Sequence, residues 1–91
     1  MKKCYIITFE LKNPGINQQK LTLSIKSAKV WAKLGPTTYL VVSSGSSIEI
    51  RDVLLKHLKV GDKIYVSLLD AAAAWYGYGD NISNWIVNNQ K

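Results

Sequence analysis

The stretch from Ser44 to Leu69, SGSSIEIRDVLLKHLKVGDKIYVSLL, contains a polar turn, an amphipathic helix, a Gly-Asp break and an alternating strand. Ser46 and Glu49 have the spacing of a capping box, in which each side chain accepts a hydrogen bond from the other residue's backbone N–H. From Asp62 to Leu69 the apolar residues recur with a period of two, as in a strand. Between the polar turn and the Gly-Asp break, the apolar residues recur at helical spacing, at Ile50, Val53, Leu54 and Leu58.

The end of this helix is marked by two residues. His57 lies in the predicted last turn, where a cation interacts favourably with the helix dipole, and Gly61 is the predicted C-terminal cap. On the exposed side of the same helix, Asp52 is expected to pair with Lys56 at i+4. Arg51 is then either a surface charge or a contact to an anionic partner.

A second strand-and-helix unit of similar size precedes this stretch. Residues 4–11, CYIITFEL, are apolar on both faces and predict a central strand, which Asn13-Pro14-Gly15 ends. Residues 16–28 fit a helical stripe but also alternate, and their helix-forming Gln and Lys residues favour the helix. Residues 29–34 and 37–43 alternate around Gly35-Pro36 and predict a hairpin.

The order of elements predicts a single α+β domain over residues 1–91. Residues 1–70 form its core as a ferredoxin-like βαββαβ fold, an antiparallel four-stranded sheet with two helices on one face. Residues 71–91 form a C-terminal aromatic segment with a short last helix, capped by Asp80, in which Ile82, Trp85 and Ile86 share a face. Because the central strands are apolar on both faces, we expect this segment and a second subunit to cover the open face.

Composition excludes several classes of protein. A 47% content of hydrophobic residues is typical of a folded core and not of a disordered chain. The single cysteine, Cys4, forms no internal disulfide and is expected to be a buried hydrophobe. The apolar run after Met1-Lys2-Lys3 is too short for a signal peptide, and no run is long enough to span a bilayer. We therefore expect a cytoplasmic protein without contact to a membrane.

The charge favours anionic partners. Twelve basic residues against six acidic ones give a formal net charge of +6, which suits nucleic acid or an acidic protein surface. Lys29, Trp31 and Lys33 follow one another on one face of the predicted strand, and lysines around an aromatic ring are typical of single-strand binders. The alternative is that Trp31 packs in the core or in a dimer interface while the lysine stems lie along it.

Short motifs along the chain resemble the SinR family of small prokaryotic and phage proteins, a name shared with an unrelated transcriptional repressor. This family is similar to the small subunit of the CRISPR adaptation complex and to the VapD ribonucleases. The resemblance implies a bacterial or phage origin, a ferredoxin-like fold and a homodimer. It rests on Lys12 to Gly15, Ile25 to Ser27, Thr38 to Ser43, Glu49 to Asp52, His57-Leu58, and Ala73-Ala74-Trp75 followed by Gly77.

The resemblance also offers a nuclease hypothesis. In the nuclease members, an aspartate at the end of the first strand holds a divalent metal across the dimer, and Glu10 stands at that position. Glutamate is one methylene longer, and no second acidic residue follows it to share the ion. The arginine-bearing first helix of the adaptation subunits is also missing, since residues 16–23 carry only Lys20. We therefore expect no catalytic residues, metal or cofactor, and a Glu10-dependent nuclease remains the alternative.

A third hypothesis concerns the C-terminal aromatic residues. One possibility is that these residues cover the sheet or take part in an oligomer contact. The second is that they form a groove that binds a protein or nucleotide signal. The residues are Trp75, Tyr76 and Tyr78. A phage or host-defence accessory protein would fit the second possibility. The leading hypothesis remains a non-enzymatic dimeric interaction module that binds an anionic partner such as nucleic acid.

Overall fold

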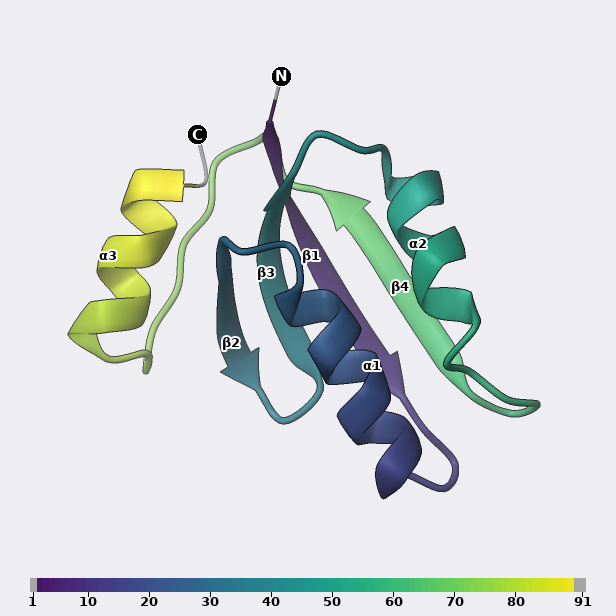
Figure 1. The fold of residues 1–91 in the computed structure, drawn as a ribbon. Helices are drawn as coiled ribbons and strands as arrows, with labels where there is room; N and C mark the ends of the chain where they lie inside the picture. The colour runs from purple at the N-terminus through teal and green to yellow at the C-terminus, as the bar shows by residue number, and fades with distance from the viewer. Residues whose placement is uncertain (1, 90–91) are drawn as a thin grey trace.

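The computed structural model describes residues 2–89, which form an α+β fold with a four-stranded antiparallel sheet and three helices (Figure 1). The strand order is β2-β3-β1-β4, so β1 is central, as its sequence predicts. This topology is consistent with the predicted ferredoxin-like arrangement. The elements are β1 (Lys3–Glu10), α1 (Ile16–Lys26), β2 (Trp31–Gly35), β3 (Thr38–Ser43), α2 (Ser47–Leu55), β4 (Lys63–Leu68) and α3 (Asp80–Asn89).

The side chains of β1 alternate between two separate cores. Tyr5, Ile7 and Phe9 are buried under α1 and α2, together with residues of β3. Cys4 points to the opposite face, where Ile86 of α3 packs against it and against neighbouring strands. The sheet is therefore covered on one face by two helices and on part of the other by α3.

Helix α3 confirms one part of the sequence prediction for the C-terminal segment. Ile82 and Trp85 pack beside Ile86 on the same face of the helix. The backbone N–H of Ser83 donates to the carbonyl of Gly79, so Asp80 is the first helical residue and not the cap. Helix α3 covers the part of this face near β2, whereas Tyr65 of β4 is 63% exposed, and dimerisation stays a prediction.

Helix α1 resolves the ambiguous segment in favour of a helix. Leu21 and Ile25 are buried, whereas Leu23, which strand alternation would place beside them, is 68% exposed. The helix ends at Lys26, and Lys29 has a φ of 73° in the turn that follows. The prediction that the strand starts at residue 29 was therefore wrong, because the left-handed backbone at Lys29 ends the alternation.

Helix α2 has the predicted capping box. The backbone N–H of Glu49 donates to Ser46 Oγ (3.1 Å), and that of Ser46 donates to Glu49 Oε1 (3.0 Å). The helix ends at Leu55, earlier than predicted, so His57 follows the last turn. Gly61 is not its cap; with a φ of 92° it forms the turn before β4.

Asp62 joins two neighbouring loops. Its carboxylate accepts hydrogen bonds from the backbone N–H groups of Lys12 (2.9 Å) and Lys59 (2.8 Å). These two bonds lower the pKa of the Asp62 carboxyl, because they favour its charged form. The carboxylate thus ties the loop after β1 to the loop before β4.

We expect Asp62→Asn to lower the melting temperature at pH 7. A carboxyl whose pKa is lower in the folded state stabilises the fold above its unfolded pKa, and this contribution disappears as the pH falls through the folded pKa. The difference in melting temperature between the two proteins should therefore shrink as the pH is lowered below about 4. Thermal melts from pH 7 to pH 2.5 measure it, with the exposed Asp70→Asn as control. A constant difference across this range would contradict the role given to Asp62.

Among residues 2–89, no helix combines the length and the apolar character needed to cross a membrane.

Candidate functional site

The positive charge of the chain is concentrated in its first half. From residue 11 to residue 48 the sequence contains no aspartate or glutamate, and its five lysines supply +5 of the net charge of +6. This run forms α1, β2 and β3 with their connecting loops. The segment's own side chains therefore carry only positive charge, and the acidic residues beside it, Glu49 and Asp62, come from later in the chain. Its lysines are Lys12, Lys20, Lys26, Lys29 and Lys33.

A polar pocket of about 500 Å³, the hairpin pocket, lies between α1 and the β2-β3 hairpin. Lys26 and Lys33 are its charged residues. The Lys26 ammonium lies 4.9 Å from the centre of the Trp31 ring, a cation–π contact that holds the charge beside the pocket. The full lining consists of Pro14, Gly15, Gln18, Gln19, Thr22, Lys26, Lys33, Pro36 and Tyr39.

A second polar pocket of about 430 Å³, the turn pocket, lies on the α2 side of α1. It brings Asn17 and Lys20 of α1 together with residues that follow α2. The helix dipole favours cations there, because the C-terminal end of α2 carries a partial negative charge. The residues contributed from beyond α2 are Lys56, His57, Leu58 and Lys59.

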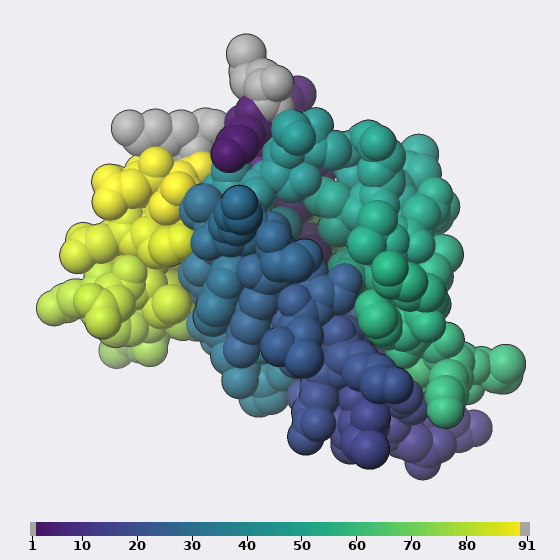
Figure 2. All heavy atoms as spheres, viewed as in Figure 1, coloured from purple at the N-terminus to yellow at the C-terminus, as the bar shows by residue number. Residues whose placement is uncertain are grey.

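A third hollow, the interhelical groove, is apolar. It has a volume of about 260 Å³ between α1 and α2, and Figure 2 shows β1 at its floor. Val53, part of the apolar stripe of the predicted helix, is 54% exposed on the wall of this groove. The apolar side chains on its walls and floor are Ile7, Ile25, Ala28, Val41, Ile50, Val53 and Leu54.

The structure separates the residues predicted to bind nucleic acid. Lys33 lines the hairpin pocket, and Trp31 packs against the core beneath α1, its ring centre 6.1 Å from that of Tyr39. Trp31 therefore supports Lys26 and is not an open platform for stacking bases. Lys29 lies in the turn before β2, outside the strand face that it was predicted to share.

Arg51 is also not a free cation. Its guanidinium donates to Asp52 through Nη2 (2.9 Å) and Nε (3.1 Å). The predicted pair between Asp52 and Lys56 is replaced by this contact between neighbours. Arg51 is therefore compensated in charge, whereas Lys56 remains available at the turn pocket.

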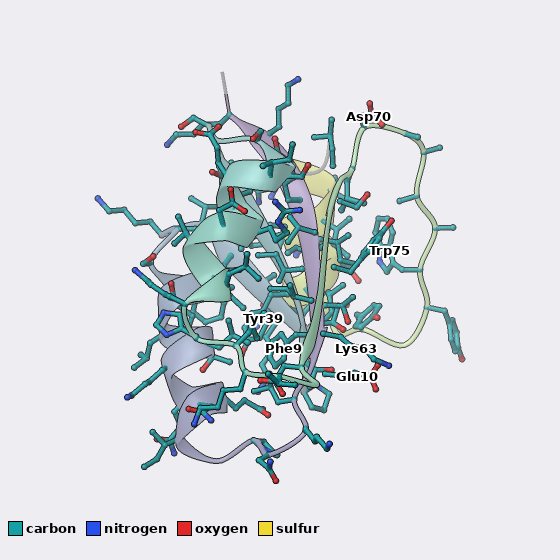
Figure 3. All side chains as sticks on the ribbon, turned by 90° about the vertical axis from the view of Figure 1, so that its right-hand side faces the viewer. Phe9, Glu10, Tyr39, Lys63, Asp70 and Trp75 are labelled. Carbon is teal, nitrogen blue, oxygen red and sulfur yellow. The ribbon has the colours of Figure 1, made fainter. Side chains whose placement is uncertain are left out.

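The aromatic residues before α3 do not gather into a pocket. Tyr76 is 97% exposed. Trp75 points from the loop back toward the sheet (Figure 3), and its indole N–H donates to Ser83 Oγ (3.1 Å). The Ser83 hydroxyl in turn donates to the carbonyl of Tyr78 (3.4 Å). These contacts fix the loop to α3, and none of the three aromatic residues lines the pockets beside α1 and α2.

Glu10 is exposed at the end of β1, opposite Lys63 of β4 in the strand register. Figure 3 shows both residues at the same end of the sheet. They line a hollow of only about 70 Å³ together with Thr8 and Phe9. Within residues 2–89, no three His, Cys, Asp or Glu side chains are close enough to hold a metal ion. A lysine beside a lone carboxylate disfavours a divalent cation, so the donor set does not fit the metal of the nuclease hypothesis.

Cys4 is buried between β1 and α3, as predicted. Burial raises the pKa of its thiol, which keeps it in the protonated form that is neither a nucleophile nor a metal ligand.

Sequence reasoning identified Lys33 but missed Lys20, Lys26, Lys56 and Lys59. For Lys20 and Lys26 the available signal is the absence of carboxylates from residue 11 to residue 48, whereas Lys56 and Lys59 lie outside this run and had no such signal. That signal indicates where the free positive charge lies, whereas the total count of lysines does not.

None of the protein-family models, curated proteins and solved structures compared with this chain matches it. The resemblance to the SinR family therefore stays a prediction from the sequence, and the function is argued from the site.

Proposed function

We propose that this protein is a non-enzymatic module that binds nucleic acid through its phosphate backbone, on the surface around α1. The observation that carries the proposal is the run of residues 11–48, which has five lysines and no carboxylate. Every charged residue that lines the two polar pockets beside α1 is basic or a histidine. Two neighbouring pockets that hold lysines and no carboxylate attract a polyanion.

The composition of this surface favours binding that tolerates any base sequence. Lysine is a point charge and lacks the planar fork with which arginine reads guanine. The neutral side chains Gln18, Gln19 and Thr22 line the hairpin pocket and are of the types that donate to phosphate oxygens. Trp31 packs beneath Lys26, so stacking on its ring does not contribute.

The scaffold inferred for this module is ferredoxin-like. The βαββαβ order, the strand order β2-β3-β1-β4 and the placement of α1 and α2 on one face support this inference. The resemblance to the SinR family supports the same scaffold and a homodimer. The binding surface proposed here lies within one chain and needs no second copy.

We expect the affinity for a single-stranded oligonucleotide to fall steeply with salt. Each neutralised phosphate contributes about −0.7 to the slope of log K against log salt concentration for single strands. Changing Lys26 and Lys33 together to Gln should therefore make the slope less negative by up to about 1.4. Fluorescence anisotropy with a labelled oligonucleotide from about 50 to about 300 mM salt, a roughly sixfold range, measures it.

The matched control is Lys3→Gln with Lys63→Gln. It removes the same charge from two exposed lysines that line neither of the polar pockets. We expect its slope to stay close to that of the unchanged protein. Equal slopes for the two double variants would show that the attraction depends on net charge alone, and an absence of binding at low salt would refute the proposed function.

A further inference from the structure

The turn pocket is lined by three lysines, whereas the hairpin pocket is lined by two. Lys56 and Lys59 approach from the segment after α2, and Lys20 approaches from α1, more than thirty positions earlier in the chain. The imidazole of His57 and the amide of Asn17 complete its polar lining. Three lysines thus line a single hollow of about 430 Å³.

The carboxylates closest in sequence do not occupy this pocket. Asp62 interacts with the Lys59 charge, but both of its oxygens accept backbone N–H groups, and it does not line the pocket. Asp52 is bonded to Arg51. The charges of Lys20 and Lys56 are therefore available to a ligand, and that of Lys59 is only partly offset.

The charge of the pocket suits one kind of phosphate better than another. A phosphate inside a nucleic-acid strand is a diester with one negative charge. A terminal phosphate is a monoester with a charge of about −1.5 to −2 at pH 7 and three free acceptor oxygens. Three lysines that line one open hollow can each donate to one of those oxygens, whereas a passing diester offers fewer of them.

We propose that the turn pocket binds the terminal phosphate of a nucleic-acid strand. This inference rests on the proposed function and adds to it the position of a strand end. With the end in the turn pocket, the rest of the strand continues along α1 to the hairpin pocket, where Lys26 of α1 and Lys33 of β2 lie. The module would then bind cleaved or processed strands more tightly than strands that end in hydroxyl groups.

The test compares single strands of one sequence that carry a 5′-phosphate, a 3′-phosphate or hydroxyl groups at both ends. A hydroxyl-ended strand two nucleotides longer equalises the total charge. We expect one of the phosphorylated strands to bind about tenfold tighter than both hydroxyl-ended strands, as one additional charge-assisted hydrogen bond provides. Changing Lys56 and Lys59 to Gln should reduce this ratio to about one. Changing Lys26 and Lys33 to Gln should weaken all strands and keep the ratio.

The outcomes separate the two proposals. Binding of all strands with equal affinity refutes the terminal-phosphate site and leaves the proposed function intact. A ratio that survives the Lys56 and Lys59 changes also refutes it, because the preference then arises elsewhere. If no strand binds at low salt, the proposed function fails and this inference fails with it.

Discussion

Deletion of residues 71–91 is expected to leave a chain that aggregates instead of folding. The deletion removes α3 and with it Ile86, which closes the second core against Cys4, Ala32 and Leu40. These three residues, buried in the complete chain, would become an apolar patch on the open face of the sheet. The measurement is the soluble fraction after expression, followed by light scattering. A soluble and cooperatively folded protein ending at Asp70 would contradict the role given to α3.

A point variant tests the same contact without deleting a helix. Ile86 is 5% exposed, so Ile86→Ala should lower the free energy of unfolding by about 2–5 kcal/mol through lost burial and a residual cavity. The matched control is the neighbouring Val87→Ala, because Val87 is 57% exposed and its loss should cost within about 0.5 kcal/mol. Urea denaturation of both variants gives the comparison. Equal costs would show that α3 does not cover the sheet.

Phe9→Ala is expected to have the largest effect of any single substitution considered. Phe9 is 1% exposed in the middle of the core under α1 and α2, and a buried Phe→Ala change costs about 3–5 kcal/mol. Small domains have a total stability of only about 5–15 kcal/mol, so a large part of it would be lost. The measurement is the midpoint of urea unfolding, read by circular dichroism.

The control for this variant is the next residue along the strand. Glu10 points to the opposite side of β1 and is exposed, so Glu10→Gln should leave the unfolding midpoint almost unchanged. The contrast between neighbours depends on the alternation of β1 between two faces. A large loss of stability in Glu10→Gln would mean that this carboxylate has a structural role that the fold does not reveal.

The elements of the fold were predictable where local chemistry and tertiary packing agree. The capping box of Ser46 and Glu49 predicts the start of α2 to the residue, because it depends on hydrogen bonds within one turn. The two apolar faces of residues 4–11 predict a central strand, because both faces of such a strand are covered by other parts of the fold. The end of α2 was misplaced, since the helical spacing of Leu54 and Leu58 continues past the point where the backbone leaves the helix.

The candidate site was less predictable because it joins distant parts of the chain. Lys20 and Lys56 share a pocket only after α1 and α2 pack on the same sheet. Lys29 was predicted beside Trp31, but the positive φ at Lys29 is a feature of the turn that alternation does not reveal. The contact of Lys26 with Trp31 depends on how α1 crosses β2, which no local pattern specifies.

The central position of β1 has a consequence for synthesis on the ribosome. β1 is translated before β3 and β4, yet it lies between them in the sheet. The nascent strand therefore keeps both of its hydrogen-bonding edges open until β3 has emerged, and one edge open until β4 follows. Pairing over such sequence distances is slow, and open apolar edges favour association with other chains. The chain is therefore expected to be most prone to association with other chains before α3 closes the second face.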